Sequence, residues 1–222
     1  MKKAVVLLSG GLDSATVLAY AKNSFDCYCL SIAYGQKHVL ELNAAKKIAE
    51  LNQVAEHKII DYDMRWIGKN ALTSQEIPVP KNQLNVDVPD TYVPARNIVM
   101  LSLALAWAEA LNCSDIFIGV NAVDFSGYPD CTPQFIAAFQ NMASVSTVTG
   151  KAQGININAP LLSLSKAEII KLGTSLGVDY SLTTSCYDPN PEGEACGACD
   201  ACRLRHQGFL EAKIPDPTVY SK

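Results

Sequence analysis

VVLLSGGLDS, residues 5–14, is an apolar run that stops at Ser-Gly-Gly and starts again at Asp-Ser. We predict a buried strand ending at Leu8, a tight turn, and a helix that begins at Asp13. Glycines let the backbone approach a ligand closely, and the start of a helix directs its N–H groups and dipole toward negative charge. The stretch therefore predicts an anion site at the end of the first strand.

The alternation of strand and helix continues beyond this turn. The first strand, 3–8, is followed by a helix over 13–23, and the segment 26–34 alternates like a second strand. Apolar residues at helical spacing predict a helix over 37–52, and 57–62 is a third strand. This order indicates βαβ units. We therefore predict an α/β fold, a Rossmann-like parallel sheet with helices on both faces.

A long irregular connection interrupts this pattern at residues 63–94, which contain several prolines. The next segment, 95–112, is apolar nearly all round and predicts a buried helix. Ser165 and Glu168 have the spacing of a capping box at a helix start. Further elements are predicted at 115–120 (strand), 133–147 (helix), 155–158 (strand) and 165–177 (helix). We expect a nucleotide-binding α/β domain over 1–180 and a metal-binding segment over 181–222 packed on it.

The composition is that of an ordinary globular protein, with 49% apolar and 18% charged residues. A formal net charge of −4 argues against broad binding to a nucleic-acid backbone, so no direct nucleic-acid partner is expected. The longest apolar stretch, Ile98–Ala108, is too short to span a membrane. The glycine turn also cuts short the N-terminal apolar run, which disfavours a signal peptide. We expect a cytoplasmic protein.

Four of the eight cysteines lie within residues 186–202. Their spacing, Cys186-x9-Cys196-x2-Cys199-x2-Cys202, suits one structural Zn²⁺ with four thiolate ligands and no open position. An iron–sulfur cluster is the main alternative, because ferredoxins use similar spacings. Two disulfides are less consistent with a cytoplasmic protein. The remaining cysteines are scattered in apolar or turn contexts and are expected to be inert: Cys27, Cys29, Cys113 and Cys131.

Two phosphate-binding motifs are missing, G-x-x-x-x-G-K-[ST] and G-x-G-x-x-G. What remains, S-G-G-x-D-S after a first strand, resembles the PP-loop of ATP pyrophosphatases, which grips the β,γ-pyrophosphate of ATP while AMP is transferred. A plain βα turn capped by Asp13 is the alternative. The resemblance implies that ATP, with Mg²⁺, contacts the loop and the end of the second strand: Leu8, Ser9, Gly10, Gly11, Leu12, Asp13, Ser14, Tyr34 and Gly35. It also implies catalytic roles for Ser9, Asp13, Ser14, Arg96 and Lys166.

Two later stretches carry more polar residues than packing requires. In TYVPARN (91–97), Arg96 opposes the dipole at a helix start, so an anionic partner is expected beside Arg96 and Asn97. GVNAVDFSGYPDC (119–131) follows a strand where such sheets bind ligands. A carboxylate and a tyrosine there could read and stack on a guanine-like ring. The predicted substrate residues of this loop are Asn121, Asp124, Ser126, Tyr128 and Asp130. An ordinary ion pair at Arg96 and a ligand-free turn are the alternatives.

Six motifs, SGGLDS, YGQKH, VPARN, DFSGYPDC, LSKAEI and CGACDAC, follow one another as in the 7-cyano-7-deazaguanine synthase family, which the chain resembles over nearly its whole length. The resemblance implies an adenine nucleotide alpha hydrolase-like fold, zinc, ATP and a homodimer. It also implies that 7-carboxy-7-deazaguanine and ammonia become a nitrile through an adenylated carboxylate and an amide, as in queuosine biosynthesis. Thr132 and Gln134 stand where the family more often has an arginine and an acidic residue.

Two other functional classes remain compatible with the sequence. A tRNA-modifying PP-loop enzyme, such as a thiolating enzyme, also adenylates a base and can carry clustered cysteines. It needs a basic RNA-facing surface, which the acidic balance disfavours. A non-catalytic nucleotide- and zinc-binding module would bind ATP without consuming it.

Overall fold

The computed structural model describes residues 1–82, 89–121 and 128–221. A parallel five-stranded sheet runs through its centre, in the order β3-β2-β1-β4-β5. The strands are β1 (Lys2–Leu7), β2 (Phe25–Ala33), β3 (Glu56–Asp61), β4 (Asp115–Phe117) and β5 (Asn156–Asn158). The chain moves outward from β1 to β3 and then returns to the other side of β1, so the strand order reverses between β1 and β4. Ligands of doubly wound sheets bind at such a reversal.

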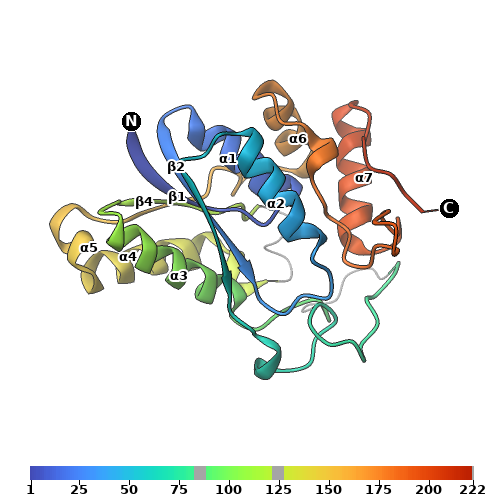
Figure 1. The fold of residues 1–222 in the computed structure, drawn as a ribbon, viewed down its shortest axis with the longest axis horizontal. Coiled ribbons are helices and arrows are strands. Elements are labelled where there is room, and N and C mark those ends of the chain that lie inside the picture. The colour runs from blue at the N-terminus through green and yellow to red at the C-terminus, as the bar shows by residue number, and fades with distance from the viewer. Residues whose placement is uncertain (83–88, 122–127, 222) are drawn as a thin grey trace.

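Helices cover both faces of this sheet (Figure 1). One face carries α1 (Leu12–Lys22), α2 (Leu40–Leu51), α6 (Lys166–Ser175) and α7 (Asp200–Ala212), and the other carries α3 (Arg96–Ala110), α4 (Pro133–Ser146) and α5 (Val148–Gln153). Successive β1 residues point to opposite faces, as strand geometry requires. Val5 packs with Leu101 on the α3 side, and Val6 packs with Leu18 on the α1 side. The predicted α/β fold is confirmed.

The predicted strands and helices are present with small differences in length. β4 ends at Phe117, three residues before the predicted end, because Gly119 leaves the sheet to pass close to the backbone of Asp13 and Ser14. α2 begins at Leu40 rather than 37, since the Lys37 amide donates to the Leu72 carbonyl instead. The capping box at α6 is confirmed: Glu168 N–H donates to Ser165 Oγ at 3.3 Å, and Ser165 N–H donates to the Glu168 carboxylate at 2.8 Å.

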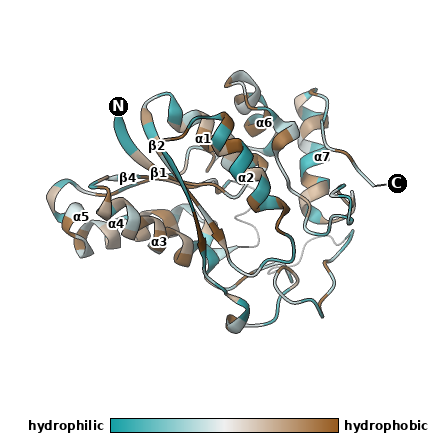
Figure 2. Ribbon diagram, viewed as in Figure 1, coloured by the Kyte–Doolittle hydropathy of each residue, from teal (hydrophilic) through white to brown (hydrophobic). Residues whose placement is uncertain are grey.

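The description of α3 as a buried helix is correct for only one of its sides. Leu101, Ala104 and Ala108 are fully buried against the sheet, and Figure 2 shows the hydrophobic colouring of this helix and of the strands beside it. Ile98, however, is 42% exposed, because a helix that covers a sheet contacts it along one stripe. Among the described residues, no helix combines the length and apolarity needed to cross a bilayer.

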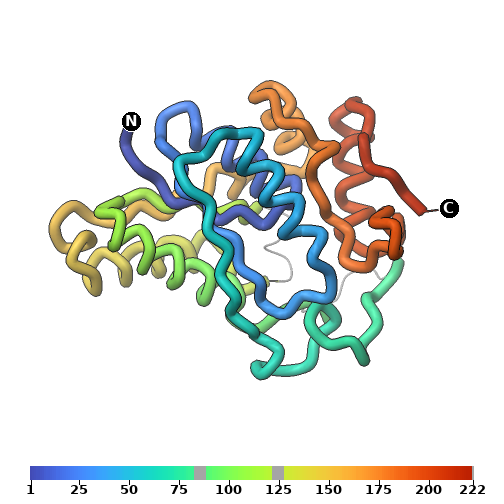
Figure 3. Tube along the Cα trace, in the orientation of Figure 1, coloured from blue at the N-terminus to red at the C-terminus, as the bar shows by residue number. Residues whose placement is uncertain are grey.

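The C-terminal residues form a second, smaller cluster beside the sheet. α7, which the sequence did not predict, buries Phe209 and Ala212 against the α1 and α6 side of the core. Val79, from the irregular segment after β3, packs among the four clustered cysteines. Lys81 also pairs with Asp188, and Asn82 N–H donates to the Ala198 carbonyl. Figure 3 shows this stretch running to the side of the molecule where the C-terminal segment lies. Short 3-10 helices complete the fold: η1 (Arg65–Ile67), η3 (Pro129–Cys131) and η4 (Tyr180–Leu182).

Candidate active site

The turn after β1 is held in shape by its two serines. Ser9 N–H and Ser9 Oγ both donate to Ser14 Oγ, at 3.2 and 3.1 Å, and the Gly11 amide donates to Ser9 Oγ at 3.3 Å. Gly10 has φ of +87°, and a Cβ placed on it would lie 2.1 Å from the Glu41 carbonyl oxygen, so only glycine fits. No side chain caps α1 at Gly11. The first N–H groups of α1 have no partner one turn earlier in the helix, and an anion at this point could accept from them.

Asp13 and Lys166 form an ion pair at the edge of this turn. Lys166 Nζ donates to both carboxylate oxygens of Asp13, at 2.9 and 2.8 Å, and Asn121 Nδ2 donates to Asp13 Oδ2 at 3.2 Å. The pair is only partly shielded, since the Lys166 and Asp13 side chains are 14% and 27% exposed. The ammonium group is thereby held next to the turn, where an anionic ligand would meet it. Three hydrogen bonds thus fix the orientation of the Asp13 carboxylate beside the turn.

Arg96 begins α3 after a residue in an uncommon conformation. Ala95 has φ of 56° and ψ of 22°, in the left-handed region, which costs a non-glycine residue roughly 1 kcal/mol. The Arg96 guanidinium lies 5.7 Å from the centre of the Tyr34 ring. Burial disfavours its charge, but the neighbouring Tyr34, Tyr187, Tyr128 and Glu41 together raise the pKa of Arg96. The start of α3 therefore places the positive charge of Arg96 in the cavity.

Asn97 and Asp130 support the start of α3 rather than forming one open polar face. The Asn97 amide donates to Asp130 Oδ2 at 2.8 Å, and Asn97 Nδ2 donates to the Asp130 carbonyl and to Cys131 Sγ, both at 3.1 Å. Tyr128 lies nearby, and its hydroxyl is 2.8 Å from Thr91 Oγ1. The carboxylate from another segment thus compensates the missing side-chain cap of α3.

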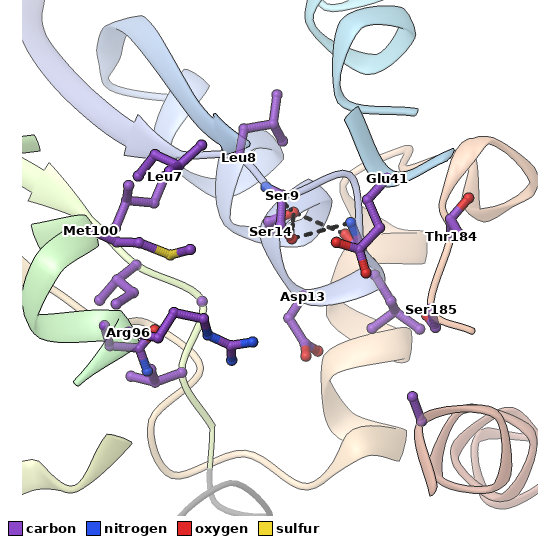
Figure 4. A pocket seen from close by; sticks show the side chains of 18 of the residues that line it. Leu7, Leu8, Ser9, Asp13, Ser14, Glu41, Arg96, Met100, Thr184 and Ser185 are labelled. Atoms are coloured by element: carbon purple, nitrogen blue, oxygen red, sulfur yellow. Dashed lines mark hydrogen bonds between the residues drawn. The ribbon is translucent and has the colours of Figure 1, made fainter. Parts of the chain in front are cut away.

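One cavity collects most of the residues that the sequence singled out (Figure 4). Its predicted lining residues are Leu8, Ser9, Gly11, Leu12, Asp13, Ser14, Tyr34, Arg96, Asn97, Tyr128 and Lys166. Other predicted residues do not line the cavity but pack against the segments that form its walls. Gly10 packs on the backbone of α2, Gly35 on the side chains of Asp63 and Arg65, Asn121 on Asp13, and Asp130 on Asn97. Asp124 and Ser126 lie outside the described residues.

The C-terminal segment provides the facing wall of this cavity. Thr184, Ser185 and Tyr187, on either side of Cys186, line it together with Leu204 and Arg205 from α7. The Thr184 amide donates to the Gly10 carbonyl at 3.0 Å, which ties this wall to the β1 turn. No sequence motif predicted these residues as part of the site. Their nearness to the cysteines was the only available signal, because nothing local says that the segment folds back over the sheet.

The four clustered cysteines fit a metal site. The sulfurs of Cys186, Cys196, Cys199 and Cys202 all lie within 4.8 Å of one another. Backbone amides already donate to these sulfurs: among them, those of Asp188 and Cys196 donate to Cys186 Sγ, and that of Cys199 donates to Cys196 Sγ. Hydrogen bonds from the Cys186 and Cys202 thiols lower the pKa of Cys199, which favours a thiolate there. A donor set of four sulfurs suits tetrahedral Zn²⁺ or an iron–sulfur cluster.

Glu41, in the first turn of α2, is a further cavity residue that the sequence analysis missed. Burial raises the pKa of Glu41 to about 7, although the charge of Arg96 opposes this rise. Burial likewise raises the pKa of Tyr34 to about 12, with Glu41 adding to the effect. Glu41 lies only three residues after YGQKH, but its place beside the β1 turn depends on how α2 packs against Gly10.

A family model and several relatives match nearly the whole chain. The model described as "Queuosine biosynthesis protein QueC" matches residues 3–213. A 7-cyano-7-deazaguanine synthase of Dechloromonas aromatica (strain RCB) is 56% identical over 222 residues, covering 99% of each chain. One of Aromatoleum aromaticum (strain DSM 19018 / LMG 30748 / EbN1) is 58% identical over 221 residues, covering 99% of this chain and 98% of the relative.

Among solved structures, the chain is similar in fold to an NMN synthetase from Francisella tularensis. The TM-score is 0.52 at 19% identity, over 96% of this chain and 78% of that chain. At this identity the likeness concerns the fold alone.

Proposed function

Because the chain belongs to the QueC family of queuosine biosynthesis proteins, we propose that it converts 7-carboxy-7-deazaguanine and ammonia to 7-cyano-7-deazaguanine at the expense of ATP. AMP and pyrophosphate are the by-products. The observation that carries the proposal is that the β1 turn, Lys166, Arg96 and three tyrosines line one cavity. An anion-binding turn and an aromatic-lined space for a heterocycle are the two things that this reaction needs side by side.

The reaction must remove two oxygens from one carbon, and a carboxylate oxygen is a poor leaving group. In the first round, the substrate carboxylate attacks the α-phosphorus of ATP, and pyrophosphate leaves. Ammonia then displaces AMP from the acyl-adenylate and forms an amide. In the second round, the amide oxygen attacks another ATP, and loss of AMP leaves the nitrile. The same site can serve both rounds, because the reacting oxygen occupies the same place in each.

The chain's part in this chemistry is positioning and electrostatic stabilisation. The turn of residues 9–12, the first amides of α1 and the Ser9 and Ser14 hydroxyls would hold the departing pyrophosphate. Lys166 and Arg96 would offset the negative charge that moves from the α-phosphate to the leaving group. Tyr34 would contact the adenosine. Tyr128 and Asn97 would contact the deazaguanine, together with the loop residues that the sequence predicted.

Five further proposals carry over from the sequence, the resemblance and the site chemistry. The four cysteines would hold one structural Zn²⁺ per chain, which fixes the Thr184–Tyr187 wall and takes no part in the reaction. Mg²⁺ would enter with ATP, bound by phosphate oxygens, as part of the co-substrate. We divide the chain functionally into the α/β domain at 1–180 and the metal-binding segment at 181–222. The protein would act as a homodimer in the cytoplasm.

The direct test incubates the purified protein with ATP, ammonia and 7-carboxy-7-deazaguanine and identifies the products. We expect AMP, pyrophosphate and the nitrile. Lys166→Met should lower AMP formation by about 10²–10³-fold, since it removes a cation that faces developing charge. Lys171→Met, on an exposed position of the same helix, is the matched control and should leave the rate unchanged. Formation of ADP and orthophosphate, or of AMP only when tRNA is added, would contradict the proposal.

A further inference from the structure

Glu41 lines the cavity near both the β1 turn and Arg96. It lies in the first turn of α2, whose backbone packs so closely on Gly10 that no side chain fits between them. Its side chain lines the same cavity as Ser9 and Ser14 of the turn that would hold pyrophosphate, and Figure 4 shows its carboxylate next to them. Figure 4 shows Glu41 and Arg96 extending into the cavity from α2 and α3, from different sides of the β1 turn. A group in this position can reach atoms bound between the turn and Arg96.

The carboxylate of Glu41 is not used by the fold. Among the described residues, no hydrogen bond or ion pair involves its oxygens. Acidic residues in a first helical turn normally stabilise the helix through its dipole, and they do this best when exposed to water. Glu168 of α6 is such a residue: it is exposed, it forms a capping box, and its pKa is lowered. Glu41 is instead half-buried in the cavity wall, and burial raises its pKa, which makes it costly as a structural charge.

The other ionisable groups around the cavity are poorly suited to accept a proton. Lys166 and Asp13 are paired with each other. Arg96 of α3 is held protonated, and burial raises the pKa of Tyr34, at the end of β2, to about 12. Tyr128, before α4, and Tyr187 and Arg205, of the C-terminal segment, also line the cavity. Glu41 is thus the carboxylate in the described cavity whose oxygens remain available.

The proposed reaction needs such an acceptor, because nitrogen enters with hydrogens and leaves with none. At neutral pH ammonia exists mainly as ammonium, which has no lone pair with which to attack. The neutral molecule, once it has attacked, carries three N–H bonds that must all be broken before a nitrile exists. A base whose pKa lies near the working pH can take up and release these protons repeatedly.

We propose that Glu41 is the general base of the nitrogen-transfer steps. This inference rests on the proposed function. In the first round, the Glu41 carboxylate removes a proton from ammonium. The nitrogen lone pair forms the C–N bond, the C–O bond to AMP breaks, and AMP leaves with that electron pair. The added N–H proton also goes to Glu41, which returns each proton to water. In the second round, Glu41 takes the two amide protons in turn as the C=N and then the C≡N bond forms and the second AMP departs.

The experiment separates adenylation from nitrogen transfer with Glu41→Gln, which keeps the size of the side chain and removes its basicity. Substrate-dependent exchange of labelled pyrophosphate into ATP, without ammonia, measures adenylation alone. Ammonia-dependent nitrile formation measures the proposed steps. We expect exchange to stay within a few-fold of the wild type, while nitrile formation falls by about 10²–10⁴-fold. Glu50→Gln, an exposed position on the same helix, should change neither rate.

Two further readouts report on proton transfer itself. In the wild type, the rate of nitrogen transfer should rise with pH through an inflection near neutrality, and Glu41→Gln should lack this inflection. Hydroxylamine is a weaker base than ammonia and is already neutral at pH 7. It should therefore intercept the acyl-adenylate of Glu41→Gln much faster than ammonia does. Glu41→Asp, which keeps an acid on a shorter stem, should recover part of the ammonia-dependent rate.

The possible failures are distinguishable. If the wild type shows no substrate-dependent exchange, the proposed function itself is wrong. If the wild type performs both reactions and Glu41→Gln retains full nitrile formation, Glu41 is not the base. Equal losses of exchange and nitrile formation in Glu41→Gln would also overturn the inference, since they would show that Glu41 acts in nucleotide binding.

Discussion

Two arginines, the buried Arg205 and the half-buried Arg96, lie near carboxylates in this molecule, and the two pairs are built differently. Arg205 and Asp216, in the C-terminal segment, have side chains only 3% and 7% exposed and form an ion pair of 3.1 Å. Arg205 also donates to the Tyr180 carbonyl at 2.9 Å and to Thr183 Oγ1 at 2.7 Å. Arg96 and Glu41, across the cavity, influence each other's charge but form no such pair.

The pKa values of the two carboxyl groups reflect this difference. Burial alone would raise the pKa of Asp216, but hydrogen bonds from Tyr220 and Thr218, together with the charge of Arg205, lower it. Burial dominates at Glu41 and raises its pKa to about 7. A fully bonded charge pair holds a scaffold together, whereas an unpaired charge in a cavity is maintained for a ligand or a reaction. The two walls of the cavity are therefore specialised, one for holding shape and one for chemistry.

Metal removal should produce the largest effect, because it acts on the wall that holds shape. We expect a strong chelator to unfold the C-terminal segment and abolish turnover, since structural zinc contributes on the order of 10 kcal/mol in zinc-finger peptides. The sheet core contains none of the four ligands, so most of the far-UV circular dichroism should remain. Adding Zn²⁺ back should restore activity. Full pyrophosphate exchange by the metal-free protein would show that the two walls are independent.

Breaking the ion pair between Arg205 and Asp216 should have the second-largest effect. Arg205→Met leaves Asp216 buried without its cation and should lower the free energy of unfolding by about 3–5 kcal/mol, measured with urea at pH 7. The lowered pKa of Asp216 contributes stability that is present above pH 4 and is lost as the pH falls through its folded value. The deficit of Arg205→Met should therefore shrink below about pH 4. Arg65→Met, at an exposed position, is the control and should not change stability measurably.

A smaller loss is expected where α2 meets the β1 turn. Gly10→Ala adds a Cβ that meets the Glu41 carbonyl and forces a left-handed residue, so it should cost about 2–4 kcal/mol of unfolding free energy. Gly177, which follows α6 in a left-handed helix cap, has a similar φ of +78° but nothing within 4 Å of an added Cβ. Gly177→Ala should therefore cost only about 1 kcal/mol, the conformational part alone. Equal losses in the two variants would show that the close approach of α2 is unimportant.

The smallest expected effect is a gain in stability rather than a loss. Because folding raises the pKa of Glu41 to about 7, its ionised form costs stability as the pH rises from about 4, where both states are protonated, to above 7. Glu41→Gln removes this cost and should stabilise the protein by about 1–3 kcal/mol at pH 8, with little change at pH 4. Thermal unfolding at the two pH values measures this difference. Destabilisation at pH 8 would mean that Glu41 is paired, like Asp216, and that the two walls do not differ.

Much of the site could be predicted from residue order alone. The β1 turn is encoded in ten consecutive residues, and the four cysteines lie within seventeen positions, so local spacing reveals both. The same holds for the capping box of α6, whose members are three residues apart. Local spacing did not predict the contact that Asp130 makes in the fold. Its loop predicts substrate contact, but in the structure one of its oxygens accepts from the start of α3, thirty-three residues away.

The sequence by itself determined which local structures form, because strand and helix periodicity, glycine conformation and thiol chemistry act between near neighbours. Only the tertiary structure decided which side chains share the cavity. Lys166 reaches Asp13 across 153 positions, and the Thr184 amide donates to the Gly10 carbonyl. Whether a carboxylate is paired, as at Asp216, or left desolvated, as at Glu41, depends on which distant segments pack against it. That packing sets the local dielectric and the available partners, and no local pattern of residues records either.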